Sequence, residues 1–136
     1  MKNLLETNIY DAKGKILICG TCLQFMQSKG YKKIIQDYDD ILFLCLEKDH
    51  INMAITKVCG MLSTGKVSSI TFASVNKSPH CTQLHYIKNE VKRVMDSAKL
   101  PEMKNIIVQD NETYEISDEC LSISKDLVRL QEKLND

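Results

Sequence analysis

The fold follows from the stretch DILFLCLEKDHINMAITKVCGMLSTGKVSSITFASV, which runs from Asp40 to Val75. Its opening, DILFLCLE, is a continuous apolar run bounded by acidic residues, as is typical of a parallel strand covered on both faces. Apolar residues then recur at helical spacing after Asp49, which is a suitable helix cap, and Gly65 is a suitable end for that helix. VSSITFASV is rich in β-branched residues and predicts another strand. A strand, a helix and a strand in this order indicate a crossover unit of a parallel sheet.

The sequence before and after this unit continues the alternation. Residues 15–19, KILIC, predict a buried strand, and a short helix is expected from a cap at Thr21 to an end at Gly30. Ser78 and Pro79 suit the cap and first turn of a helix after the third strand. Its apolar stripe is expected to contain Leu84, Ile87, Val91, Val94, Met95 and Ala98.

The last third of the chain predicts a hairpin and a helix. KNIIVQ and ETYEI flank Asp110-Asn111, a plausible two-residue hairpin turn. A final helix is expected to open with an Asp cap and to present one apolar face, which would contain Cys120, Ile123, Leu127, Leu130 and Leu134. We therefore predict one α/β domain over residues 1–136, in three layers, with a mainly parallel sheet, helices on both faces and a C-terminal hairpin at one edge.

Composition narrows the classes of partner. The chain has 136 residues, and its 18 Lys and Arg balance its 18 Asp and Glu, which does not favour a nucleic-acid or membrane-surface protein. No run approaches the ~18 apolar residues of a membrane span, and the first residues lack the apolar region of a signal peptide. We expect no nucleic-acid partner, no membrane partner and a cytoplasmic location, where the six cysteines would stay reduced.

Reactive side chains follow three of the predicted strands. Cys19-Gly-Thr-Cys22 follows the first, Cys45-Leu-Glu47-Lys-Asp49-His50 the second, and Ser74-Val-Asn76-Lys-Ser78-Pro-His80-Cys81 the third. Ligands of open parallel sheets bind at the carboxyl ends of the strands. We therefore expect these thiols, imidazoles and carboxylates to gather at one edge of the sheet, although they are far apart in sequence.

Cys19 and Cys22 form a C-x-x-C pattern. This spacing is compatible with a redox disulfide, a shared metal ion or a thiol of lowered pKa, and equally with a buried strand residue at Cys19. Cys22 is expected near a helix N-terminus, where the helix dipole favours the thiolate.

Cys81 is expected in a first helical turn, with His80 beside it and His85 one turn later. A group of Cys and His can bind a metal, or the imidazole can assist a thiolate nucleophile. A small buried thiol and a solvated imidazole would explain the same residues without a site.

Three further polar residues are secondary candidates for binding a cofactor: Glu47, His50 and Asn76. For Glu47 and His50 a solvated loop is the ordinary interpretation. Cys45 is expected in the core of a strand, and Cys59 and Cys120 on apolar helical faces, so we assign no site to them.

The segment ILICGTCLQF resembles the strand–C-G-T-C–helix segment of DsrE-like sulfur-metabolism domains. This resemblance implies an α/β fold, a homo-oligomer and a cysteine that carries a persulfide. The region from Cys45 to Met95 resembles α/β segments of iron–sulfur ferredoxin-like proteins of anaerobes, in which Pro-Cys-Cys opens a helix. Here the corresponding residues are Pro79-His80-Cys81, and the ferredoxin cluster-binding cysteine run is absent.

These observations lead to three hypotheses. The first is a thiol-based sulfur-relay or redox protein, in which Cys19, Cys22 or Cys81 is the reacting thiol and His80 adjusts the reactivity of its thiolate. The cargo would be persulfide sulfur, and the donor or acceptor would be the thiol of another protein. The second is a non-enzymatic zinc or iron–sulfur protein with ligands from Cys19, Cys22, His80, Cys81 and His85. The third is a small-ligand module in which the cysteines are incidental.

Overall fold

The computed structural model describes residues 2–136 and contains a five-stranded sheet in the order β2-β1-β3-β4-β5. The strands are β1 (Gly14–Gly20), β2 (Asp40–Leu44), β3 (Val67–Val75), β4 (Glu102–Gln109) and β5 (Glu112–Ile116). The α-helices are α1 (Leu23–Met26), α2 (Ser28–Ile34), α3 (Ile51–Ser63), α4 (Pro79–Leu84), α5 (Tyr86–Val94), α6 (Asp118–Lys125) and α7 (Leu127–Asn135), with short 3-10 turns η1 (Leu4–Glu6), η2 (Ile35–Asp37) and η3 (Ser97–Lys99).

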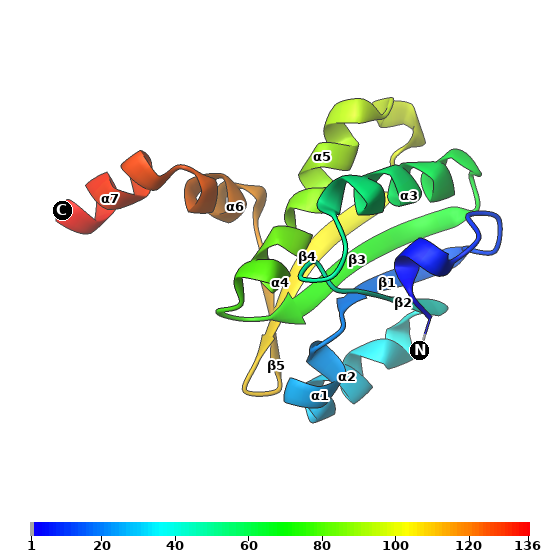
Figure 1. Ribbon diagram of the computed structural model, residues 1–136, viewed down its shortest axis with the longest axis horizontal. Helices are drawn as coiled ribbons and strands as arrows, with labels where there is room; N and C mark the ends of the chain where they lie inside the picture. Colours follow the sequence, from blue (N-terminus) through cyan, green and yellow to red (C-terminus); the bar gives the residue numbers. More distant parts are fainter. Residues whose placement is uncertain (1) are drawn as a thin grey trace.

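The sheet is parallel except at one edge. β1 pairs in parallel with β2 and β3, β3 pairs in parallel with β4, and β5 runs antiparallel to β4. Helices α3, α4 and α5 cover one face, and α1 and α2 cover the other (Figure 1). This arrangement confirms the predicted three-layer α/β domain and its C-terminal edge hairpin.

Two apolar clusters hold the layers together. On the face covered by α3 and α5, Ile18, Phe72 and Ile87 are fully buried, and on the opposite face Leu17, Leu23 and Ala73 are fully buried. Alternate residues of β1 and β3 thus point to opposite faces, as the period of a strand requires. Because these strands are buried on both faces, their sequences are nearly continuous apolar runs.

Several predicted boundaries agree with the structure. Ser78 caps α4 with its side chain, and Pro79 is in the first helical turn. Gly65 adopts a φ of +75° just after α3, a left-handed conformation that glycine accepts without strain. Asp110 and Asn111 have φ values of 53° and 60°, as expected at the two central positions of a type I′ hairpin turn.

Other boundaries were wrong. The helix expected up to Gly30 is two helices, and Gly30 lies inside α2, where an added Cβ would come within 2.7 Å of Val108. Close packing against β4, rather than a helix end, therefore explains this glycine. The cap of α3 is His50, not Asp49, and β2 ends at Leu44, before Cys45.

The last helix differs most from its prediction. It is divided into α6 and α7 at Asp126, and Ser117 caps α6 in place of an Asp. In α6 only Leu121 is buried, no residue of α7 is buried, and both helices extend away from the sheet (Figure 1). The predicted apolar stripe of this helix is therefore not a core face within the described chain.

No helix in residues 2–136 has both the length and the apolar character that crossing a membrane requires.

Candidate functional site

The candidate site lies at the carboxyl ends of β1, β2 and β3. After β1 the chain continues to β2 on one side, whereas β3 lies on the other side of β1. This is a topological switch point, where the connections leave the sheet in opposite directions. The segments that follow the three strands hold Cys22, Cys45 and Cys81, so these three thiols lie at the same edge of the sheet.

Cys19 is a buried core residue at this edge. Its side chain is fully buried in the cluster that contains Leu17 and Leu23, and its Sγ lies 3.5 Å from the carbonyl oxygen of Gly20. Burial, and secondarily the nearby Cys81 thiol, raise the pKa of Cys19 to about 12. Cys19 is therefore a protonated, weakly reactive thiol at neutral pH.

Cys22 is the exposed thiol of the site. It occupies the cap position of α1, a helix of four residues, and makes no side-chain capping hydrogen bond. Its pKa is raised by partial desolvation, then by Cys81, Cys45 and Glu47 in decreasing order. The expectation of a stabilised thiolate is wrong, because such a short helix has little dipole and the nearby groups are thiols and a carboxylate.

Cys81 lies between the other two cysteines of the site. It is 8% exposed, near the start of α4, and its backbone N–H donates to the Ser78 hydroxyl at 3.4 Å. Its Sγ is 3.5 Å from the position that a Cβ on Gly20 would occupy. Cys81 is the thiol that raises the pKa of both Cys19 and Cys22, so it is the neighbour that the two members of the C-x-x-C pattern share.

A buried polar chain holds α4 against the sheet. The Ser74 Oγ lies 2.6 Å from Nε2 of His85, and Nδ1 of His85 lies 2.9 Å from the Asn105 Oδ1. All three residues are at most 1% exposed. The Ser74 Oγ also lies 3.2 Å from the carbonyl oxygen of Cys81. These contacts join β3, β4 and the C-terminal end of α4, and so help to fix Cys81 in place.

The hydrogen bonds define the protonation of His85. An amide oxygen only accepts, so Nδ1 carries the hydrogen, and Nε2 is an acceptor that shares the hydrogen of the Ser74 hydroxyl with the carbonyl oxygen of Cys81. Burial lowers the pKa of His85 to about 4, and the hydrogen bond with Asn105 opposes this only in part. The order Ser–His–Asn resembles a nucleophile chain. Ser74 is fully buried, however, so the chain acts here as a neutral clamp.

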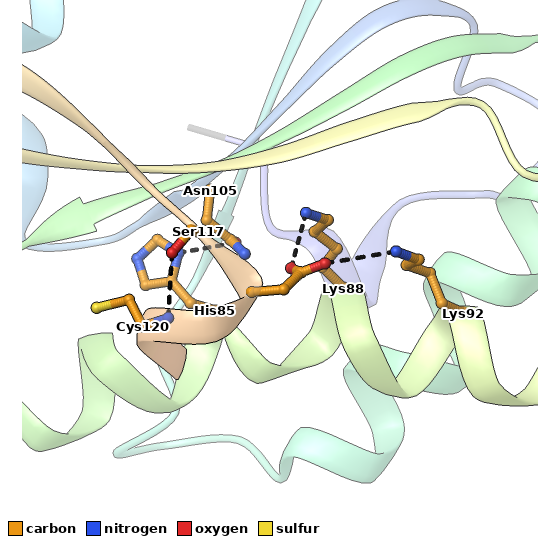
Figure 2. A network of polar contacts seen from close by, with 7 residues as sticks. His85, Lys88, Lys92, Asn105, Ser117 and Cys120 are labelled. Carbon is orange, nitrogen blue, oxygen red and sulfur yellow. Dashed lines mark hydrogen bonds and ion pairs between the residues drawn. The ribbon is translucent and has the colours of Figure 1, made fainter. Parts of the chain in front are cut away.

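Figure 2 shows part of this clamp beside a second polar cluster, which lies on the next helix. His85 and Asn105 face each other across their hydrogen bond, and Lys88 and Lys92 lie further along α5. The Lys88 and Lys92 ammonium groups lie 3.0 and 3.5 Å from the carboxylate of Asp118 in α6. The Lys88 hydrogen bond is the main cause of the lowered pKa of Asp118. This ion-pair cluster fastens the start of α6 to α5.

The remaining candidates lie around the thiols without forming one cluster. His80 is exposed beside Cys81, and Glu47 is exposed near enough to affect Cys22. His50 is exposed at the start of α3. Asn76 is exposed, and its amide donates to Gln109 at the end of β4.

The structure does not assemble the ligand set of the metal hypothesis. Both ring nitrogens of His85 are engaged in hydrogen bonds inside the core, so this residue is corrected from a candidate ligand to a structural residue. Within residues 2–136, no three or more His, Cys, Asp or Glu side chains are arranged to hold a metal ion. The geometry therefore does not favour a zinc or iron–sulfur centre formed by these residues.

Sequence reasoning missed the roles of three residues of this region. Cys45 was assigned to a strand core, but it lies just after β2, is half-buried, and raises the pKa of Cys22. Ser74 and Asn105 are polar residues on inward-facing positions of apolar strands, and that break in the pattern was the available signal.

A family model described as a Rossmann-like domain matches residues 11–135 of the chain. No curated protein and no solved structure gives a significant match.

Proposed function

The chain belongs to the Rossmann-like domain family, and from this premise we propose that it is a thiol-based redox or sulfur-relay protein whose reacting residues are Cys22 and Cys81. Open sheets of this kind carry their chemistry at the switch point of the strand order. Cys22 follows β1 and Cys81 follows β3, the two strands at the switch point. The single observation that carries the proposal is that the Cys81 Sγ lies 3.5 Å from the position of a Cβ on Gly20, only two residues before Cys22, although the two thiols are distant in sequence.

The segment after β1 does not favour dinucleotide binding in the usual Rossmann manner. That mode uses the pattern G-x-G-x-x-G, in which the second glycine lets the pyrophosphate approach the backbone. Here the segment reads Gly20-Thr-Cys22-Leu-Gln-Phe25, so a thiol and an aromatic ring replace the second and third glycines. The position that would contact a phosphate therefore presents a thiol to solvent.

The two thiols differ in a way that suits sequential reaction. Cys22 is exposed and can meet a partner, whereas Cys81 is almost buried and only needs to reach Cys22. Phe25 and Met26, on the same short helix as Cys22, are 72% and 62% exposed. Large apolar side chains around an exposed thiol favour a protein partner over a free small molecule.

The redox step conserves atoms and electrons. The Cys22 thiolate attacks one sulfur of a partner disulfide, a mixed disulfide forms, and the other partner sulfur leaves as a thiolate. The Cys81 thiolate then attacks the Cys22 sulfur, which releases the second partner thiolate and leaves a Cys22–Cys81 disulfide. The partner gains two electrons, the two cysteines lose them, and the protons of both cysteines pass to the released thiolates.

The relay step uses the same nucleophile. The Cys22 thiolate attacks the outer sulfur of a donor persulfide, and the donor leaves as a thiolate. A persulfide then remains on Cys22, and no external oxidant or reductant is required. The raised pKa of Cys22 means that both steps become faster as the pH rises toward that value.

The test uses the full chain, reduced and kept without oxygen. One sample is treated with glutathione disulfide and another with glutathione persulfide, and intact mass and peptide mapping locate each product. We expect a Cys22–Cys81 disulfide in the first sample and an added sulfur atom on Cys22 in the second, or one of these two products alone.

The matched control is Cys120→Ser, because Cys120 is also exposed but lies on α6, which follows β5 and not one of the three strands that lead into the site. This variant should react as the natural chain does. Cys22→Ser should abolish both products, and Cys81→Ser should stop the redox reaction at a mixed disulfide on Cys22. Reaction that depends on Cys120, or no product at Cys22 in either sample, would reject the proposal.

A further inference from the structure

The opposite end of the sheet carries a second group of polar residues that the thiol chemistry does not use. On the sheet face toward α1 and α2, the core consists of apolar residues near the carboxyl ends of the strands, such as Leu17, Ala73 and Ile106. Toward the amino ends, the same face becomes polar. Lys15 of β1 is in register with Ser69 of β3, which is in register with Glu102 of β4.

The next row of this face is polar on two of its three strands. Leu17 pairs with Thr71, and Thr71 pairs with Lys104. Lys15 and Lys104 therefore lie on the two strands that flank β3, with the hydroxyls of Ser69 and Thr71 between them. Of these polar residues only Thr71 is buried. A buried polar residue on a central strand breaks the pattern that a core requires, and such breaks are expected at functional or strained sites.

These residues line a cavity of about 300 Å³. Asp37 of η2 and Tyr38, which follows it, complete its wall. A neighbouring cavity of about 620 Å³ shares Asp37, Tyr38 and Lys104, so the two cavities adjoin, and we call them together the groove. The smaller part is at the lower limit of ligand pockets, and the larger part leaves room for an extension of the ligand.

Thr71 offers a buried donor to this groove. It is 2% exposed, and the Tyr38 hydroxyl donates to its Oγ1 at 2.8 Å. Because a hydroxyl has one hydrogen of its own, Thr71 can still donate to a further acceptor. A ligand oxygen in the cavity would be a suitable acceptor for that hydrogen.

The charges around the smaller cavity are balanced. Lys15 and Lys104 supply two positive charges, and Asp37 and Glu102 supply two negative ones. None of these four side chains takes part in a salt bridge within residues 2–136. Unpaired charges of both signs around one cavity fit a ligand that itself carries both signs.

We propose that this groove binds a small zwitterion with the charge pattern of a free amino acid. Its carboxylate lies over β3, between Lys15 and Lys104, and accepts the hydrogen of Thr71. Its ammonium faces Asp37 and Glu102, and its side chain extends into the larger, polar part of the groove. This function is independent of the thiol proposal, because the two sites share no residue.

The first experiment is an NMR titration of the isotope-labelled full chain with each of the standard free amino acids. We expect at least one of them to shift the backbone amides of Lys15, Ser69 and Thr71 in a saturable way. The best ligand is then compared with its N-acetyl derivative, which lacks the ammonium, and with its carboxamide, which lacks the carboxylate. Each derivative should bind about tenfold more weakly, as the loss of one charged contact predicts.

Variants then separate the two ends of the ligand. Lys104→Gln should weaken the binding of the amino acid but not that of its carboxamide. Glu102→Gln should weaken the binding of the amino acid but not that of its N-acetyl derivative. Lys92→Gln, an exposed lysine on α5, is the control and should change neither. The proposal is overturned if no amino acid shifts these amides, or if acetate or inorganic phosphate shifts them as strongly as any amino acid does.

Discussion

The two edges of the sheet carry different kinds of polar group and hold them differently. At the carboxyl edge the side chains of the clamp, Ser74, His85 and Asn105, are uncharged and buried, and they hydrogen-bond to one another from different elements. At the amino edge the groove contains charged side chains, such as Lys15 and Glu102, which are exposed and unpaired within residues 2–136.

This difference has a physical origin. A buried polar group costs free energy unless it is hydrogen-bonded, so the carboxyl edge needs a specific arrangement of partners. The Asn105 Nδ2 is buried without such a partner within residues 2–136. An exposed charge remains solvated, so the charged side chains of the amino edge lower the stability of the fold little, and replacing them changes that stability little. We therefore expect substitutions at the carboxyl edge to affect stability strongly, and substitutions at the amino edge to affect binding instead.

The largest expected effect is that of His85→Ala. The substitution leaves a cavity and removes both hydrogen bonds of the clamp, so the free energy of unfolding should fall by about 3 kcal/mol or more. Denaturant unfolding followed by circular dichroism measures this change. The control is His80→Ala, an exposed residue of the same helix, for which we expect a change below about 0.5 kcal/mol. Equal effects of the two substitutions would contradict the clamp.

Acid should weaken the same clamp. The folded-state pKa of His85 is about 4 and the ordinary value is 6.5, so as the pH falls the unfolded chain takes up the proton first. The contribution of His85 to the free energy of unfolding is therefore fully present above pH 6.5 and decreases as the pH falls to about 4. Below that pH this group lowers the stability no further. The shift corresponds to a loss of about 3 kcal/mol.

Unfolding in denaturant at a series of pH values measures this loss. His85→Gln cannot take up the proton, so its stability should depend much less on pH over the same interval. Asp118 does not account for this loss, because its pKa is lowered from 3.8. Its contribution to the free energy of unfolding is therefore lost only as the pH falls below the interval in which His85 acts. A natural chain with constant stability from pH 6.5 to 4 would show that His85 is not held neutral.

An intermediate effect is expected at the thiols. The rate of Cys22 alkylation by iodoacetamide should rise with pH and have a midpoint above the ordinary value of 9.0. Cys81→Ser should lower this midpoint, since it removes a neighbour that raises the pKa of Cys22. Peptide mapping by mass spectrometry gives the rate for each cysteine, and Cys19 should stay unmodified until the chain unfolds. An unchanged midpoint in Cys81→Ser would mean that the two thiols do not interact.

The smallest effect on stability is expected at the amino edge. Lys15→Gln should change the free energy of unfolding by less than about 0.5 kcal/mol, because the exposed ammonium has no partner to lose. The same denaturant experiment measures it, beside His85→Ala. A loss comparable to that of His85→Ala would mean that the charges of this edge are structural, and the contrast between the two edges would no longer hold.

Local sequence determined the strands, several helix ends and the general location of the thiols. Apolar runs such as DILFLCLE give parallel strands because burial on both faces needs no polar residue. Ser78, Pro79, Gly65 and the Asp110-Asn111 turn act through their own backbone and nearest neighbours, so their effects can be read from sequence. The order of these elements also brought Cys22, Cys45 and Cys81 to one edge, as parallel strands require.

Tertiary structure decided which of these residues interact. Cys19 and Cys22 are close in sequence, but Cys19 is buried and has a pKa of about 12, whereas Cys22 is exposed. Both thiols have Cys81 as a neighbour. His85 became a neutral structural residue because Ser74 and Asn105 reach it from two strands. Desolvation and hydrogen bonding depend on groups that are distant along the chain, which is why local pattern could place these side chains but not assign their roles.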